Sequence, residues 1–153
     1  MSVTIRVFSE ADTEAVIALW RQAFPEYNDA SRPHRNPRLS IANKLGTQPE
    51  LFFVATRDAD GALVGTAMAG YDGHRGWLYS VAVAPEARRH GLGTRLVRHA
   101  ENALAAMGCL KLNLQVLTDK AEVLAFYEQL GYRTDAVVSL GKRLAVQESE
   151  ALA

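Results

Sequence analysis

The hexapeptide Arg88-Arg89-His90-Gly91-Leu92-Gly93 lies between a β-like run at residues 78–83 and a helical pattern at residues 92–107. A strand, a glycine-containing loop and a helix start bring free backbone N–H groups and the positive end of a helix dipole together, which favours an anion such as phosphate. The two arginines add planar donors that can bind phosphate oxygens in pairs. The two glycines let the backbone approach a ligand closely. The hexapeptide therefore indicates a phosphate site, and a well-capped, solvated turn is the alternative.

The spacing of the glycines disfavours two familiar phosphate-binding loops. It matches neither the dinucleotide-binding Gly-x-Gly-x-x-Gly pattern nor the Walker Gly-x-x-x-x-Gly-Lys-Ser/Thr pattern. The loop also lacks a lysine, and no obvious pair of metal-binding carboxylates accompanies it, so a phosphotransfer or nucleotide-binding protein is disfavoured.

The loop instead resembles the Arg/Gln-x-x-Gly-x-Gly/Ala signature of the GCN5-related N-acetyltransferase (GNAT) family, with Arg88, Gly91 and Gly93 in the signature positions. In that family the loop binds the pyrophosphate of acetyl-CoA. The resemblance implies acetyl-CoA as co-substrate and no metal. The loop residues that it assigns to cofactor binding are Arg88, Arg89, His90, Gly91, Leu92, Gly93 and Thr94.

The stretch from Leu124 to Tyr132 is a second anchor of the resemblance. It is similar to the family's C-terminal signature, in which an apolar pair, a tyrosine and a charged pair precede Leu-Gly-Phe/Tyr. On its own, a tyrosine on an apolar helix face is typical of a core residue. Together with the phosphate loop, the resemblance makes Tyr127 the catalytic proton donor to the departing thiolate.

The order of expected elements agrees with the acetyltransferase fold over nearly the whole chain: one strand, two helices, three strands, a helix, a strand, a helix and one or two strands. We expect an α/β (α+β) protein with a central mixed, mostly antiparallel sheet flanked by about four helices. The expected strands are 3–8, 51–56, 63–71, 76–83 and 110–117, with two short strands within 132–146. The first helix is expected to follow a capping box formed by Ser9 and Asp12 and to end near Pro25, and the other helices are expected at 37–46, 92–107 and 121–130.

The resemblance also suggests how the thioester is held. The family's fourth strand bulges and splays from its neighbour, so backbone N–H groups around Val81 to Val83 would bind pantetheine and polarise the carbonyl. Lys120 stands where the family usually has an asparagine that bonds the cofactor, and we count it as a further cofactor contact.

The general base is open. Many family members carry a glutamate in the strand before the phosphate loop or in the following strand, and those positions are Trp77 and Gln115 here. Asp72, His74, a water relayed by Tyr79, or no enzymic base at all are the alternatives. For Asp72 and His74, a solvated hairpin tip is the competing interpretation.

The acceptor pocket is expected beside the irregular segment from Pro25 to Pro37. Tyr27, Asn28, Asp29 and Trp20 are candidate contacts, together with Asp72, His74 and Tyr79. Trp20 also fits the apolar face of its helix, and Asn28 and Asp29 also fit a turn.

Composition bounds the function classes. The chain has 153 residues, 48% of them hydrophobic, with 17 basic and 17 acidic side chains. We expect a single N-acetyltransferase domain over residues 1–153, a cytoplasmic location, and neither nucleic-acid nor membrane binding. The one cysteine, Cys109, fits packing better than catalysis.

The sequence therefore predicts acetyl transfer from acetyl-CoA to a primary amine, on a small molecule, peptide or protein. The alternative is a non-enzymic acyl-CoA-binding or sensing module, favoured by the missing glutamates. The hairpin over residues 65–76, Gly-Thr-Ala-Met-Ala-Gly-Tyr-Asp-Gly-His-Arg-Gly, resembles that of a bacterial subgroup whose members mostly have no assigned substrate. The family resemblance also implies a homodimer through residues 132–146.

Overall fold

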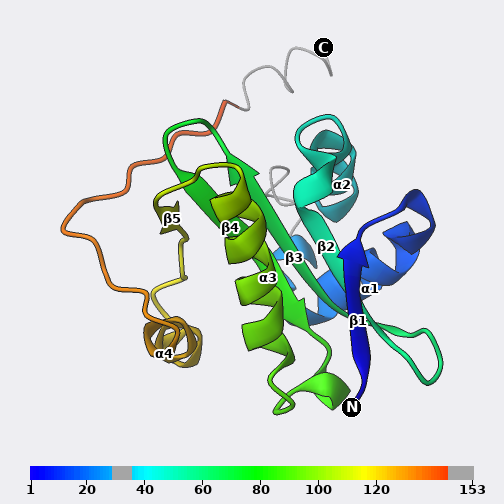
Figure 1. Cartoon of the computed structure of the whole chain (residues 1–153). Helices are drawn as coiled ribbons and strands as arrows, with labels where there is room; N and C mark the ends of the chain where they lie inside the picture. Colours follow the sequence, from blue (N-terminus) through cyan, green and yellow to red (C-terminus); the bar gives the residue numbers. More distant parts are fainter. Residues whose placement is uncertain (29–35, 145–153) are drawn as a thin grey trace. The chain divides into compact units, whose positions relative to one another are not determined.

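The computed structural model describes residues 1–28 and 36–144 (Figure 1). The chain forms two compact units, residues 1–115 and residues 116–153. Among these described residues, the first unit contains the sheet and three α-helices, and the second contains one α-helix.

One five-stranded sheet, ordered β1-β2-β3-β4-β5, forms the centre of the first unit. The first four strands are antiparallel neighbours, whereas β4 and β5 run parallel. The expected mixed, mostly antiparallel sheet is confirmed. The strands are β1 (Val3–Val7), β2 (Phe52–Arg57), β3 (Leu63–Tyr71), β4 (Gly76–Val83) and β5 (Leu112–Asn113).

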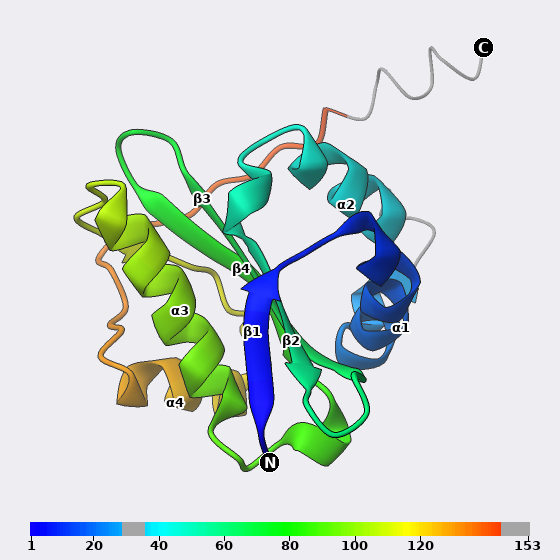
Figure 2. The ribbon, with the colours of Figure 1, turned by 45° about the vertical axis from the view of Figure 1, so that its right-hand side comes forward.

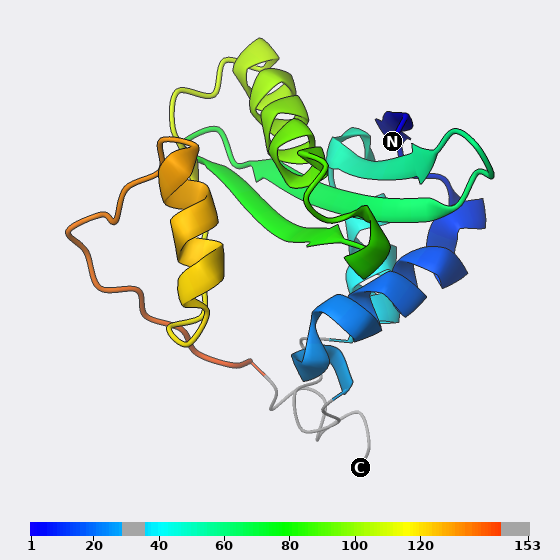
Figure 3. The same ribbon diagram turned by 90° about the horizontal axis from the view of Figure 1, so that it is seen from below.

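Helices cover both faces of this sheet. Helices α1 (Thr13–Ala23) and α2 (Pro37–Leu45) lie on one face, and α3 (Leu92–Ala106) lies on the other (Figures 2 and 3). The second unit contributes α4 (Ala121–Gln129). Short 3₁₀ turns lie at Glu10–Asp12, Pro25–Asn28, Pro49–Leu51 and Pro85–Ala87.

The helix starts follow from local chemistry. Before α1, the backbone N–H of Ser9 donates to the Asp12 carboxylate at 2.9 Å, which completes the capping box indicated by the sequence. Asp12 also accepts two hydrogen bonds from Arg6, at 2.8 and 2.9 Å. Before α2, the Asn36 side chain accepts from the N–H of Leu39 at 3.1 Å, and Pro37 occupies the first helical position.

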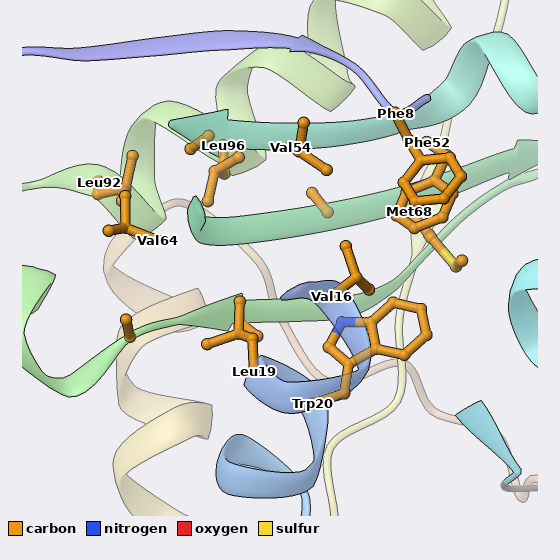
Figure 4. Packing of buried hydrophobic residues seen from close by; sticks show 14 of the residues in the cluster. Phe8, Val16, Leu19, Trp20, Phe52, Val54, Val64, Met68, Leu92 and Leu96 are labelled. Carbon is orange, nitrogen blue, oxygen red and sulfur yellow. The ribbon is translucent and has the colours of Figure 1, made fainter. Parts of the chain in front are cut away.

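The core lies between α1 and the sheet, with α3 completing it from the opposite face (Figure 4). The rings of Phe8 and Phe52 stack with centroids 4.3 Å apart. Trp20 of α1 and Leu96 of α3 are fully buried. These contacts fix both helices against the strands that lead to the site.

The C-terminal part differs from the sequence prediction. Strand β5 has two residues instead of the eight expected over 110–117, and no strand occurs between residues 132 and 144, where most of two short strands were expected. Residues 145 and 146 lie outside the described residues. The apolar side chains that suggested strands are exposed: Val137, Val138, Leu140 and Leu144. An apolar pattern forms a strand only where it joins a sheet and buries one face, and these side chains bury no such face.

Candidate active site

A β-bulge interrupts the pairing of β3 with β4. Met68 pairs with Tyr79 and Thr66 pairs with Ala82, so three peptide steps on β4 face two on β3. Within the extra step Ser80 adopts φ = 53°, a left-handed conformation that is rare for a residue with a side chain. This bulge lies just before Val81 to Val83, the segment that the family resemblance predicts to bind the thioester.

Side chains from β3 and α1 hold this bulge. The Thr66 hydroxyl donates to the Ser80 carbonyl at 2.9 Å and accepts from the indole Nε1–H of Trp20 at 2.9 Å. Both Thr66 and Trp20 are completely buried. The Tyr27 hydroxyl lies 3.5 Å from the Ser80 hydroxyl, and either oxygen can donate.

Strands β4 and β5 separate after their first contacts. Within the described residues they pair only at Gly76 with Leu112 and at Trp77 with Asn113. The predicted splay between these strands is therefore confirmed. The half of β4 that carries Val81 and Val83, both half-buried, has no β5 partner and offers backbone groups to a ligand.

The loop from Arg88 to Gly91 connects the 3₁₀ turn after β4 with α3, as expected. Gly91 precedes α3 at φ = 72° and no side chain caps the helix, so the first-turn N–H groups of Leu92, Gly93 and Thr94 have no intrahelical partner. Arg89 also has a positive φ of 67°. No acidic residue occupies the first turn.

The loop is held at both of its ends. Ala87 before it is fully buried and Leu92 after it is 3% exposed. The Arg88 Nε–H donates to the Val83 carbonyl at 3.2 Å, which ties the arginine to the end of β4. Arg88, Arg89 and His90 themselves are exposed. Geometry and charge together suit an anionic, phosphate-like group.

The candidate acceptor contacts separate into distinct places. Tyr27 lies at the bulge, and its ring stacks on Trp20 with centroids 5.7 Å apart. Asn28 is exposed and donates to the Arg21 carbonyl at 3.3 Å. Asp29 lies outside the described residues. The competing interpretation of Trp20 as a core residue agrees with its complete burial.

Asp72 and His74 lie on the exposed turn between β3 and β4. The Asp72 carboxylate accepts from the backbone N–H groups of His74 and Arg75, each at 2.7 Å. These bonds lower the pKa of Asp72, and the bond from the Arg75 N–H contributes most. The Asp72 carboxylate is therefore a weaker base.

Sequence reasoning missed a buried cation on the same face as Tyr79. Lys44 of α2 is 5% exposed, and its Nζ donates to the Ala69 carbonyl at 2.5 Å and lies 5.7 Å from the centroid of the Tyr79 ring. Burial lowers the pKa of Lys44 and raises that of Tyr79. The sequence signal that could have indicated its burial is the spacing from Ile41, because residues three apart on a helix lie on the same face.

The second unit carries the remaining candidates. Tyr127 lies on α4, is 8% exposed, and makes edge-to-face contacts with Phe126 and Tyr132 at centroid distances of 5.0 and 5.5 Å. Burial raises the pKa of its phenol to about 12. Lys120 is exposed and precedes the first residue of α4.

The sequence matches the model of the Acetyltransferase (GNAT) family over residues 13–132. The chain belongs to the GNAT family. An acetyltransferase of Yersinia enterocolitica is 44% identical over 144 residues, which cover 94% of this chain and 97% of the relative. The acetyltransferase of Pectobacterium atrosepticum is 42% identical over 140 residues, which cover 92% and 94% of the two chains. This GNAT protein is therefore an acyl-CoA-dependent N-acetyltransferase that acts on an amine.

Solved GNAT structures share its fold. The Ard1 structure from Thermoplasma volcanium has a TM-score of 0.74 at 27% identity and covers 89% of this chain and 86% of its own. The PaiA N-acetyltransferase of Thermoplasma acidophilum, solved with coenzyme A, has a TM-score of 0.75 at 20% identity, with coverage of 91% and 94%. The latter likeness concerns the fold alone.

Two further findings concern residues 1–28 and 36–144 of this acetyltransferase. No group of three or more His, Cys, Asp or Glu side chains there is arranged to hold a metal ion. None of the helices there has the length and apolar character needed to cross a membrane.

Proposed function

We propose that this enzyme transfers the acetyl group of acetyl-CoA directly to a primary amine. The observation that carries the proposal is the β4 bulge at Ser80, followed along the chain by the arginine- and glycine-containing loop at the start of α3. The bulge and the parting of β4 from β5 leave backbone donors free beside a site suited to pyrophosphate.

The phosphate loop supplies affinity. The N–H groups of Leu92, Gly93 and Thr94 and the positive end of α3 favour the pyrophosphate, and Arg88 and Arg89 add charge. His90 adds a polar side chain next to them. The N–H groups of β4 at Val81 and Val83 bind the amide-bearing arm and the polarised carbonyl, and Lys120 contributes a further contact.

The reaction forms a C–N bond and breaks the thioester C–S bond, so one proton leaves the amine and one reaches the sulfur. Tyr127 donates the second proton. Because burial raises its pKa to about 12, the phenol is protonated throughout the neutral range. The phenolate that forms is a strong base, so Tyr127 recovers its proton from the acceptor side as the amine loses one.

The proposed acid therefore lessens the need for a separate strong base. Trp77 and Gln115 cannot act as one, and the Asp72 carboxylate is occupied by two backbone hydrogen bonds. His74 and a water relayed by Tyr79 remain the candidates for removing the proton that an acceptor ammonium loses before it attacks as the neutral amine. Tyr27 and Asn28, in the 3₁₀ turn after α1, are the proposed acceptor contacts.

We also propose that residues 1–153 act as a single acetyltransferase domain. The match to the family model supports this because it continues across the boundary between residues 115 and 116. The exposed apolar side chains after α4 suit association of two copies, so a homodimer is expected on size-exclusion chromatography with light scattering.

The test is release of CoA thiol from acetyl-CoA in the presence of a panel of small amines, lysine peptides and N-terminal peptides. Acceptor-dependent release supports the transferase. Tight acetyl-CoA binding without release under any acceptor would refute the proposal in favour of a sensing module.

The role of Tyr127 is tested by Tyr127→Phe, with Tyr132→Phe as the matched control because that phenol belongs to a ring in contact with Tyr127. Loss of a general acid costs about 10²–10⁴-fold in turnover. We expect Tyr127→Phe to lower kcat by such a factor with acetyl-CoA affinity unchanged. A parallel fall in both would make Tyr127 a binding or packing residue.

A further inference from the structure

We infer that Thr66, held by Trp20, is a positioning residue that orients the backbone N–H of Val81 toward the reacting carbonyl. The inference rests on the proposed acetyl transfer and adds two residues to its machinery, neither of which touches a substrate. It is carried by the two hydrogen bonds of the buried Thr66 hydroxyl.

The geometry follows from the peptide bond. The Ser80 carbonyl and the Val81 N–H belong to one planar trans unit, in which the two groups point in opposite directions. The Ser80 carbonyl points toward Thr66 on β3, because it accepts the Thr66 hydroxyl at 2.9 Å. The Val81 N–H therefore points away from β3. That is the direction in which β4 has parted from β5.

The bulge needs such a restraint. Ser80 at φ = 53° is in a region that costs a residue with a side chain of order 1–3 kcal/mol, so the conformation persists only where its surroundings impose it. In a regular ladder the Ser80 carbonyl would have a backbone partner. At the bulge the Ser80 carbonyl accepts the Thr66 hydroxyl, and this bond favours one orientation of the peptide plane.

Trp20 fixes the Thr66 hydroxyl in turn. A hydroxyl has one proton and rotates freely, so it can donate or accept along several directions. The indole N–H can only donate, and it occupies the acceptor side of Thr66 Oγ1 at 2.9 Å. The proton of Thr66 is thereby directed to Ser80. Because both residues are fully buried, water cannot substitute for either bond.

The experiment compares Thr66→Val, which keeps the shape and removes the hydroxyl, with Thr66→Ser, which keeps the hydroxyl. Trp20→Phe is the second variant, and Thr56→Val on β2 is the matched control for loss of a strand threonine away from the bulge. Each is characterised by kcat, acetyl-CoA affinity and melting temperature. The carbonyl stretching frequency of bound acetyl-CoA, labelled with carbon-13 at the acetyl carbonyl, reports polarisation directly.

Removal of a whole oxyanion donor costs about 10²–10³-fold in kcat, so misorientation of one is expected to cost about 10–100-fold. We expect this loss in Thr66→Val, with acetyl-CoA affinity within about threefold of wild type and a carbonyl band shifted back toward that of free acetyl-CoA. Thr66→Ser and Thr56→Val should retain both the rate and the band, and Trp20→Phe should be intermediate.

Wild-type kcat in Thr66→Val would overturn the inference, as would a loss that Thr66→Ser fails to restore. If wild-type protein transfers no acetyl group to any acceptor, the proposed function fails. The inference is then decided by the carbonyl band alone: an equal band in wild type and Thr66→Val overturns it, and a difference restored by Thr66→Ser supports it. Should Thr66→Val not fold, Trp20→Phe supplies the same comparison.

Discussion

Replacement of Arg88 by alanine tests the phosphate loop without disturbing the core. Arg88 is exposed, and its Nε–H donates to the Val83 carbonyl at 3.2 Å. That bond aligns the guanidinium along the end of β4 and leaves its two Nη groups available among the described residues. We expect Arg88→Ala to weaken CoA binding while the protein keeps its melting temperature.

The magnitude follows from this geometry. A hydrogen bond to a charged group contributes about 1.5–3 kcal/mol, and an exposed site belongs at the lower end of that range. A loss of about 1.5–2 kcal/mol corresponds to an increase in Kd of roughly 10–30-fold at 25 °C. Because the contact is between exposed charges, the difference between wild type and variant should shrink as salt is added.

The assay is isothermal titration with two ligands, CoA and pantetheine, the second of which has no phosphate. Arg88→Ala should weaken binding of CoA and leave that of pantetheine unchanged. Arg98→Ala, which removes an exposed arginine from α3 beyond its first turn, is the matched control and should bind both ligands as wild type does. Equal weakening of both ligands, or an unchanged affinity for CoA, would refute the assignment of this loop to the pyrophosphate.

Three further variants test the fold around the site. Gly91→Ala places a side chain at φ = 72° and should lower the free energy of unfolding by about 1 kcal/mol or more, measured in urea; no change would mean that the loop relaxes. Leu96→Ala empties a fully buried position and should cost about 2–5 kcal/mol in the same measurement. The hydrogen bonds from Arg6 lower the pKa of Asp12, so this pair stabilises the fold above pH about 4 and the contribution is lost as pH falls through the lowered value. Asp12→Asn should therefore be less stable than wild type at pH 7, and this difference should vanish in strong acid; a gap that persists would contradict an ionic origin.

Elements whose signals are local could be predicted from the sequence. The helix starts at Pro37 and Leu92 carry proline, glycine or capping residues next to an apolar stripe, and β3 and β4 flank a turn-forming Asp-Gly pair. Their bounds agree with the expected ones to within about a residue. The phosphate loop was predictable for the same reason, because its glycines and arginines are contiguous.

Features set by pairing between distant segments were not predictable in detail. The bulge at Ser80 exists only relative to the register of β3, and Trp20 meets Thr66 across 46 positions of sequence. Nothing within a short window marks Ser80 as left-handed. The incorrect prediction over residues 132–144 has the opposite cause, because short strand-like runs were visible in the sequence but the partner strand that they require was assumed.

The anchoring of the phosphate loop between buried Ala87 and buried Leu92 has a consequence for the thermodynamics of binding. A loop that orders only on contact with its ligand spends part of the interaction energy on lost conformational freedom. Here folding of the core has already fixed both ends, one residue before Arg88 and one after Gly91. Association of CoA should then proceed without a slow ordering step, and the heat capacity change should reflect the surface covered by the ligand alone. The hydrophobic core thus holds both ends of the loop in place before the ligand arrives.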